Sequence, residues 1–557
     1  MGNRSWIVGV GIAALVLIAS LFFFSANNED ATAQDEGIVI LHRGNGAEPS
    51  TLDPNKETGI WETTITGDLL MGLYTPAADA SAILGSAEAH EVSEDGMTHT
   101  FTIREGLKWS DGEPVTAYDF QYAWRRFVNP ETAAEFASLM DWVVNADEII
   151  RGELPPEELG AIAVDDRTFV VQLTHPEPFI PEITATYYTY PIPAHVVEEH
   201  GDAWTRAGNY VSNGPFVLTE WVSNDHITLE KNPEFFDAEN VAVDRIIYYP
   251  TEDSSSALRR FRAGEIDINS DFPSQQYEWL QENMADDIRV VPMYTVSYTT
   301  INTLVPPFDD IRIRRALGLA FNRNTVTDQV LRTGQVPAFT LVPPYVDNYP
   351  SPSPEYVSWT QEEREAESRR LLAEAGYGEG NPLTFTYRYR ESIDNRRVAV
   401  AVANMWSEVG VQVNLVNTEP AIHYADMRTG NFQVADGGWI VSYPDPGQFL
   451  LLANPDHGEL NNSSYSNPRY AELYAEAQAT IDRAERGRIF AEAEALMLYE
   501  APLLPSHFGV SRALVGPHVQ GWIDNPNNVH RSRWLSIDEA LRPEQTSFTD
   551  RIMGLFN

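Results

Sequence analysis

Cysteine is absent from this chain of 557 residues. Its absence excludes a disulfide framework, thiol catalysis, cysteine-rich metal sites and a lipid-modified N-terminal cysteine. Stability must therefore come from apolar cores. The chain has ample material for them, because 43% of its residues are hydrophobic and 11% are aromatic. The usual ~100–200 residues per domain predict two to four domains for a chain of this length.

Lysine is nearly absent as well. Lys56, Lys108 and Lys231 are the only lysines, and 38 basic residues stand against 81 acidic ones, which gives a formal net charge of −43. An electrostatic field of this sign repels nucleic acid and anionic membrane surfaces, so no nucleic-acid partner is expected. The acidity is typical of a solvated surface in salty surroundings, where ions screen self-repulsion. An acidic patch for cationic ligands is the alternative.

Residues 1–33 have the pattern of a secretory signal peptide. Arg4 supplies a positive end, residues 7–24 form an apolar run, and Ala31-Thr32-Ala33 offers a small-x-small cleavage site before Gln34. The sequence therefore predicts export from the cytoplasm. An uncleaved run of about 18 apolar residues is also long enough to span a bilayer, so an inner-membrane anchor through residues 7–24 is the alternative.

Helical and strand-like patterns alternate along nearly the whole mature chain. Thr116, with Asp119 three residues later, predicts a capping box at the start of a helix. Residues 253–268 predict a helix, a terminating Gly264 and then a strand. Similar patterns return at residues 311–334, 361–376 and 382–416. This alternation, without internal repeats or low-complexity linkers, predicts an α/β fold.

A search for catalytic motifs favours binding over catalysis. The chain has no G-x-S-x-G nucleophile elbow and no H-E-x-x-H zinc motif. The segment HVVEEH at His195–His200 misses the H-x-x-E-H pattern by one residue and is interpreted as a polar helix. The glycines at 44–46 and 376–380 do not fit a phosphate-binding loop. We therefore expect no catalytic residue, cofactor or metal, whereas a secreted hydrolase would need a titratable pair in a cleft.

Six stretches resemble the extracytoplasmic oligopeptide-binding proteins of peptide ABC transporters, which are bacterial solute-binding proteins of family 5. The stretches are LHRGNGAEPSTLDPNKETG, KWSDGEPVTAYDFQYAWRRFVNPETA, GDAWTRAGNYVSNGPFVLTEWVSNDHITLEKNPEFFD, RRFRAGEIDI, PPFDDIRIRRALGLAFNRN and GGWIVSYPDPGQFL. They follow the family's order and extend over about residues 38–515.

The resemblance implies a periplasmic-binding-protein fold of type II, with two hinged α/β lobes and an extra α/β domain of the cluster C kind. The implied domains are lobe I at 37–70, 210–301 and 515–540, the extra domain at 71–209, and lobe II at 302–514. A peptide would bind between the lobes, and hinge closure would bury it. The implied protein is a periplasmic monomer that delivers its ligand to inner-membrane ABC permease subunits.

The resemblance also implies where the ligand lies. An extended peptide pairs its backbone amides with a strand edge whatever its sequence, while roomy wet pockets accept its side chains. By position, Gly438, Trp439 and Ile440 would line the peptide backbone, and Ile60 would face it from lobe I. Core packing alone is the alternative role for Trp439.

Ser442 departs from the family pattern at the ligand's amino end. Relatives commonly carry an aspartate here to pair with the α-ammonium, whereas serine can accept a hydrogen bond but cannot neutralise a buried charge. Asp445, three residues later, could substitute if the turn is rearranged.

The carboxyl end departs too. Asp436 stands where some relatives have an arginine, and Asn395 stands where some have a histidine. Three nearby arginines could compensate: Arg396, Arg397 and Arg428. The departures leave ligand length and preference open, and they allow a modified peptide or a non-peptide solute such as a sugar oligomer, an opine or a chelated metal. A membrane-tethered scaffold or holdase is the further alternative if the N-terminal segment is never cleaved.

Overall fold

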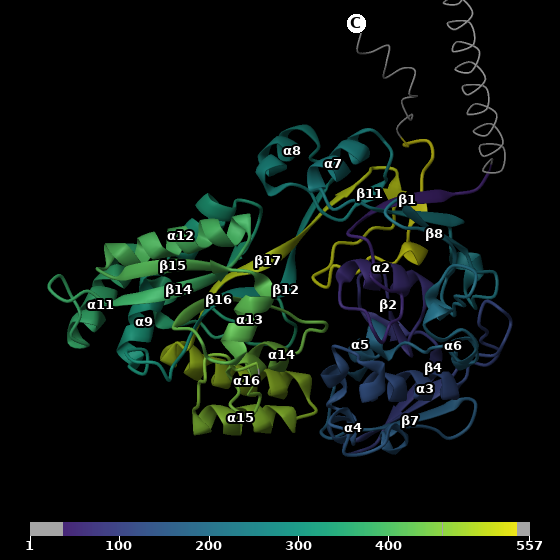
Figure 1. Cartoon of the computed structure of the whole chain (residues 1–557), viewed down its shortest axis with the longest axis horizontal. Helices are drawn as coiled ribbons and strands as arrows, with labels where there is room; N and C mark the ends of the chain where they lie inside the picture. The colour runs from purple at the N-terminus through teal and green to yellow at the C-terminus, as the bar shows by residue number, and fades with distance from the viewer. Residues whose placement is uncertain (1–36, 459, 543–557) are drawn as a thin grey trace, which may run out of the picture.

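The computed structural model describes residues 37–458 and 460–542, and it has two lobes and an extra domain (Figure 1). One 11-stranded sheet runs through both lobes. Its strands, in spatial order, are β15 (Gln412–Thr418), β14 (Thr384–Arg390), β16 (Val434–Ile440), β12 (Ile288–Ile301), β17 (Leu503–Val515), β11 (Ile268–Asn269), β1 (Ile40–Gly46), β10 (Arg245–Pro250), β9 (His226–Lys231) and β8 (Phe216–Val222), and β13 (Val336–Pro337) pairs with β17.

Strands β12 and β17 connect the lobes. They are 14 and 13 residues long and antiparallel, and each belongs to lobe I at one end and to lobe II at the other. Residues 288–292 of β12 pair with 510–514 of β17 beside β11, whereas residues 295–301 pair with β16. The β12–β17 register shifts between Pro292 and Val296. Such a bulge bends a strand, so this is the expected pivot between the lobes.

Lobe II covers its part of the sheet with helices. Thr360 and Glu363 form a reciprocal capping box at the start of one of them. Asn322 interrupts the helical pattern predicted at 311–334, because its side chain accepts the Thr325 N–H at 3.1 Å and begins a new helix. The main helices are α9 (Ile311–Ala320), α10 (Arg323–Thr325), α11 (Gln361–Glu374), α12 (Ile393–Glu408), α13 (Pro420–Arg428), α14 (Gly447–Leu450), α15 (Pro468–Gln478) and α16 (Arg483–Glu500).

Lobe I confirms the helix–glycine–strand pattern predicted for residues 253–268. Gly264 has a φ of 71° and follows the helix, and the strand after it is short. The helices of this lobe are α2 (Ile60–Leu69), α7 (Ser254–Arg262) and α8 (Tyr277–Asn283), and a small hairpin of β18 (Val519–Gln520) and β19 (Ser536–Ile537) follows the return of the chain.

The extra domain is built on a four-stranded antiparallel sheet and a helix. The predicted capping box of Thr116 and Asp119 is present at the start of that helix. The sheet order is β4 (Ala87–Val92), β5 (Thr98–Ile103), β7 (Thr168–Gln172) and β6 (Ala161–Ala163), with the hairpin β2 (Tyr74–Pro76) and β3 (Ala82–Leu84) and the helices α3 (Ala117–Val128), α4 (Ala146–Ile150), α5 (Ile180–Ile183) and α6 (Ala194–His200).

Lobe I and the extra domain share one hydrophobic core. Leu41 and Ile246 of lobe I belong to the same buried cluster as Phe101 and Trp124 of the extra domain. Because interiors are close-packed and resist deformation, we expect these two parts to move as one body against lobe II.

Two sequence predictions concern other parts of the chain. The segment HVVEEH lies in α6, where the His195 Nε2 is 2.8 Å from a carboxylate oxygen of Asp111. In residues 37–458 and 460–542, no helix is both long and apolar enough to cross a membrane. The predicted signal peptide, or anchor, lies outside these described residues.

Candidate functional site in the interlobe cleft

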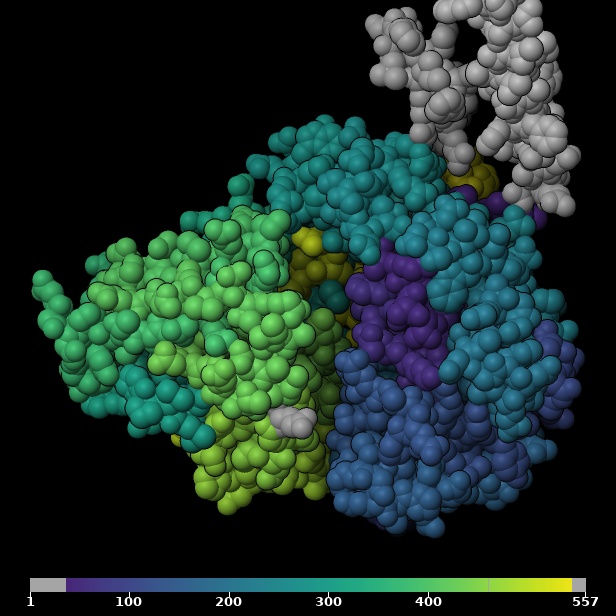
Figure 2. Space-filling model, in the orientation of Figure 1, coloured from purple at the N-terminus to yellow at the C-terminus, as the bar shows by residue number. Residues whose placement is uncertain are grey.

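A deep cleft separates lobe II from the body formed by lobe I and the extra domain. Figure 2 shows it between the green surface of lobe II and the purple and blue surface opposite, with atoms of the crossing strands at its base. Strand β16 lies on the lobe II side and helix α2 on the lobe I side (Figure 1). The two elements that the family resemblance implies for ligand binding thus belong to the two parts that the cleft separates.

Strand β16 has one edge that is only partly paired. Along one edge, all seven of its residues pair with β12. Along the other edge, β14 pairs only with Val434 and Ala435. In the described part of the chain, no strand covers this second edge from Asp436 to Ile440. The outward-facing backbone groups from Gly437 to Ile440 are thus available to an added strand, whereas the Asp436 carbonyl already lies 2.8 Å from the His423 Nε2.

Two glycines let neighbouring side chains lie close against this strand. A Cβ on Gly437 would lie 2.5 Å from the Tyr298 ring, so only glycine fits there. A Cβ on Gly438 would lie 3.2 Å from the Arg390 Nη2, which shows how closely that guanidinium approaches the strand. The strand then emerges toward solvent, because Ile440 is 68% exposed.

Ile60 opens helix α2 on the other side of the cleft. It is 67% exposed, which is unusual for a large apolar side chain, and Trp61 beside it is 37% exposed. Ile440 in one lobe and Ile60 in the other are therefore large apolar side chains that the described residues leave mostly exposed.

Trp439 is half-buried and serves lobe II itself. Its ring packs against the hydrophobic cluster around α15 and α16, and its Nε1 donates to the Gln448 carbonyl at 2.6 Å. The structure thus gives Trp439 a packing role, and the remaining exposed part of the ring is what a ligand could contact.

Ser442 and Asp445 have very different surroundings. Ser442 is exposed, and its hydroxyl makes no hydrogen bond to the residues that the structure describes. Asp445 is 1% exposed and forms a two-pronged ion pair with Arg486, with N–O distances of 2.5 and 3.2 Å. Since Arg486 already matches its charge, Asp445 could bind a ligand's ammonium only if this pair opened.

The Asp445–Arg486 pair lies where lobe II meets the extra domain. The Arg486 Nη2 is 3.8 Å from a carboxylate oxygen of Glu177, and burial raises the pKa of Glu177. The ring of Tyr443, also from lobe II, lies 5.8 Å from that of Phe179. Lobe II and the extra domain are therefore in direct contact here, and we call this contact region the seam.

Asp436 is bound by a residue that the sequence analysis missed. The Arg390 Nε donates to the Asp436 carboxylate at 3.0 Å, and the Arg390 N–H donates to its other oxygen at 2.8 Å. The Arg390 Nη1 donates to the Tyr424 hydroxyl at 2.8 Å, and the His423 Nε2 lies 2.8 Å from the Asp436 carbonyl. The acid at position 436 thus holds an arginine from the neighbouring strand.

A small pocket lies beside this arginine. Asn395, His507, Gly437 and Arg390 are among its lining residues. Burial and the nearby Arg390 lower the pKa of His507 to about 4, so its imidazole is neutral at neutral pH. The pocket therefore offers Arg390, which is already paired with Asp436, and neutral polar groups around that pair.

The arginines proposed from the sequence lie elsewhere. Arg397 pairs with Asp394 at 3.3 Å, and Arg396 is exposed. Arg428 ends α13, is exposed, and has no ion pair within the described residues. A signal for Arg390 did exist, because it lies in the patterned stretch 382–416 and ends its first strand, β14. Parallel strands such as β14 and β16 place their carboxyl ends at one edge of a sheet.

The family described as "Bacterial extracellular solute-binding proteins, family 5 Middle" matches residues 82–459, which is more than half of the chain. The periplasmic oligopeptide-binding protein OppA of Salmonella typhimurium is 35% identical over 517 residues, covering 92% of this chain and 95% of that protein.

Solved structures agree with the sequence relatives. The unliganded open form of the periplasmic murein tripeptide-binding protein MppA aligns with a TM-score of 0.80 and 33% identity over 90% of this chain and 98% of its own. OppA of Haemophilus influenzae in complex with the peptide RPPGFSPFR aligns with a TM-score of 0.76 and 34% identity, covering 90% of this chain and 99% of its own. The type II binding-protein fold expected from the sequence is thus confirmed.

Proposed function

Because the chain belongs to family 5 of the bacterial extracellular solute-binding proteins, we propose that it captures oligopeptides in the interlobe cleft and delivers them to an ABC importer. Its relatives are binding proteins, and we extend this to a function without catalysis. The periplasm is the proposed site of action, inner-membrane permease subunits are the proposed partners, and a monomer is the proposed state.

The observation that carries the proposal is the open edge of β16 facing the cleft. A peptide laid along residues 436–440 would continue the sheet of lobe II, with hydrogen bonds from backbone to backbone. Such bonds do not depend on the ligand's side chains. Closure against Ile60 and Trp61 of α2 would then cover the peptide's other face.

Arg390 is the proposed reader of the ligand's carboxylate. Its guanidinium lies beside Gly438 and is oriented by Asp436 and Tyr424, so it is held in place before a ligand arrives. Charge-assisted hydrogen bonds of this kind are roughly twice as strong as neutral ones.

Ser442 is the proposed neighbour of the ligand's amino end. Its hydroxyl is exposed and can accept one hydrogen bond from an ammonium, but it supplies no charge. The amino end would therefore stay partly hydrated. The protein should tolerate a blocked amino terminus better than a binding protein that holds an aspartate at this position.

A two-step experiment tests the function. Native mass spectrometry of gently purified protein, followed by release and sequencing of its cargo, should yield short peptides of mixed sequence. Isothermal titration with trialanine should then give a 1:1 complex. N-acetyl-trialanine should bind within about tenfold of trialanine, whereas trialanine amide should bind more weakly still, since the amide removes the charge that Arg390 meets.

The opposite results would refute the proposal. A single non-peptide mass in the native spectrum, with no heat from any of the three peptides, would retain the fold and overturn the substrate class. The non-peptide alternative rests mainly on Ser442, and the relatives reported above do not favour it.

A further inference from the structure

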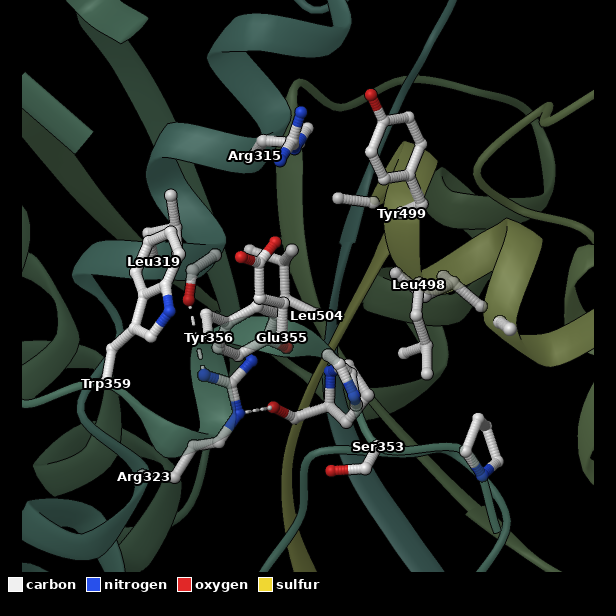
Figure 3. Close-up of a pocket in the computed structure, with 17 residues that line it drawn as sticks. Arg315, Leu319, Arg323, Ser353, Glu355, Tyr356, Trp359, Leu498, Tyr499 and Leu504 are labelled. Carbon is white, nitrogen blue, oxygen red and sulfur yellow. Dashed lines mark hydrogen bonds between the residues drawn. The ribbon is translucent and has the colours of Figure 1, made fainter. Parts of the chain in front are cut away.

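Lobe II contains a second cavity, away from the cleft. Its volume is about 210 Å³, and it lies between α9, the segment 352–359, the end of α16 and the start of β17 (Figure 3). It shares no lining residue with the pocket beside Arg390. Strand β17 separates the two, because Leu503, Leu504 and Pro505 line the cavity while Ser506 and His507 line the pocket.

A buried guanidinium forms part of the cavity wall. Arg323 is 1% exposed, and all four of its hydrogen bonds go to backbone carbonyls. Figure 3 draws two of these bonds, to Gly318 and Pro505. Within residues 37–458 and 460–542, no carboxylate forms an ion pair with Arg323, and its Nη2 donates no hydrogen bond.

An uncompensated buried charge needs an explanation. Burying an ionised group is costly unless it is paired, and arginines are rarely buried without a partner. Aromatic rings supply part of the compensation, because the Arg323 guanidinium carbon lies 5.1 Å from the Phe339 ring centroid and 5.7 Å from that of Tyr356. A full negative charge is still missing, and the free Nη2 belongs to a residue that lines the cavity.

Other charges around the cavity add to this imbalance. Arg315 lies on the side opposite Arg323, over the Tyr499 ring at 4.4 Å, and has no ion pair among the described residues (Figure 3). Arg364 is 8% exposed, lies 6.0 Å from the Phe339 ring, and its buried Nε has no partner in the same part of the chain. In a protein with a net charge of −43, this local excess of cations stands out.

The rest of the wall is largely apolar. Leu319, Leu498, Leu504 and Trp359 contribute side chains, and Glu355 at the exposed rim is the single acid among the lining residues. A cavity of about 150 Å³ can hold benzene, so this one has room for a ligand on the order of ten non-hydrogen atoms. The wall thus matches a compact apolar body.

We propose that this cavity is a second binding site of the protein, for a small carboxylate with an apolar body. The carboxylate would accept hydrogen bonds from the Arg323 Nη2, with Arg315 contributing charge from the other side, and the apolar body would fill the space among the leucines and Trp359. The site does not depend on the peptide cleft for its function.

The probe for this site is 3-phenylpropionate, whose eleven non-hydrogen atoms suit the cavity (about ten by volume). Isothermal titration should show one site at millimolar or lower concentration. The neutral 3-phenylpropionamide has the same shape and should bind at least about tenfold more weakly, because it cannot supply the missing charge. Saturating the cleft with trialanine should leave the probe's affinity unchanged.

Variants at the rim identify the site without removing Arg323, whose four carbonyl bonds hold the lobe together. Ala495→Trp should abolish probe binding, because this exposed alanine lines the cavity and the indole would fill it. Ala475→Trp, at an exposed alanine of α15 that does not line the cavity, is the matched control and should bind the probe normally. Glu355→Gln should tighten binding severalfold and Arg315→Gln should weaken it severalfold.

Three results would overturn the proposal. The first is equal affinity for the acid and its amide. The second is a complex that trialanine displaces or that Ala495→Trp leaves intact, which would place the probe in the cleft or elsewhere. The third is the absence of heat at millimolar probe. Trialanine binding by each variant is measured in parallel. It shows whether peptide binding is intact when the probe fails to bind, so failure of the second site and failure of the peptide function are told apart.

Discussion

At the scale of single residues, the charges expected for a peptide's two ends are rearranged. Asp436 stands where an arginine is expected, and the structure brings Arg390 against it from the adjacent strand. Ser442 stands where an acid is expected, and Asp445 is already neutralised by Arg486. Arg390, the proposed carboxylate reader, is thus paired with Asp436 but keeps an Nη2 without a hydrogen bond among the described residues, whereas Ser442 supplies no charge at the proposed amino end.

Replacing Ser442→Asp should strengthen the binding of trialanine by about tenfold or more, because a hydrogen bond to a charged partner adds roughly 1.5–3 kcal/mol. Isothermal titration measures the change. N-acetyl-trialanine is the control ligand, and it should gain nothing because it carries no ammonium. An unchanged or reduced affinity for trialanine would mean that residue 442 does not face the amino end.

Replacing Arg390→Gln should weaken trialanine binding by about tenfold while hardly affecting trialanine amide, since only the free acid has a charge to lose. The matched control is Arg388→Gln. Arg388 lies two residues before Arg390 on β14, and its substitution breaks an ion pair with Asp426. If both substitutions weaken both ligands equally, the effect is on the stability of β14, and Arg390 is not a carboxylate reader.

At the scale of elements, buried polar contacts attach loops to helices. Glu494 of α16 is fully buried and accepts N–H groups of Leu341 and Val342 at 2.5 and 3.1 Å, and the Tyr349 hydroxyl bonds to its other oxygen. Helix α16 thereby fixes the segment that leads from β13 toward the wall of the second cavity. Burial raises the pKa of Glu494 to about 7.

The raised pKa of Glu494 predicts a pH dependence of stability. The ordinary pKa of a glutamate is 4.5. Between this pH and about pH 7, Glu494 keeps a proton in the folded chain that it has lost in the unfolded chain. The free energy of unfolding should therefore fall as pH rises through this window, by up to about 3 kcal/mol. Glu494→Gln keeps the side-chain shape and an oxygen that accepts the Leu341 and Val342 N–H groups, but it cannot ionise. The substitution should therefore flatten the dependence of the free energy of unfolding on pH.

Denaturant unfolding of both proteins across that pH range measures the difference. Glu492→Gln, at an exposed position of the same helix that pairs with Arg469 at 3.1 Å, is the control and should follow the parent protein. Identical slopes for the parent and the Glu494→Gln variant would show that Glu494 is ionised throughout and stabilised by its hydrogen bonds.

At the scale of the whole molecule, we expect opening to be a movement of lobe II against a single body formed by lobe I and the extra domain. Lobe I and the extra domain share a hydrophobic core. Among the described strands, only the paired strands β12 and β17 run from lobe I into lobe II. Across the seam, Arg483 of lobe II pairs with Glu182 of the extra domain at 2.8 Å and lies 4.1 Å from the Phe179 ring centroid.

Replacing Arg483→Gln should shift the unliganded protein toward open forms, because it removes the ion pair and the ring contact that span the seam. Small-angle X-ray scattering should give a larger radius of gyration without ligand and the parent value with trialanine. Arg488→Gln, whose 2.8 Å pair with Glu485 lies within α16, is the control. A radius unchanged by Arg483→Gln would show that the seam does not hold the cleft closed.

The parts that the sequence by itself determined are local ones. The capping box of Thr116 and Asp119, the helix stop at Gly264 and the α/β alternation all depend on residues near each other in the chain, whose conformations follow from short-range sterics and hydrogen bonds. The family resemblance rested on the same kind of local pattern, and the comparisons confirmed it.

Which charged residues come into contact depends on the tertiary structure. Arg390 and Asp436 are 46 residues apart, and they come together because β14 and β16 lie side by side and parallel. Asp445 pairs with Arg486, 41 residues away, and the second cavity is assembled from three stretches of lobe II, residues 315–323, 352–359 and 495–505. Pairings over such distances depend on strand order and helix packing, which no pattern within one segment records.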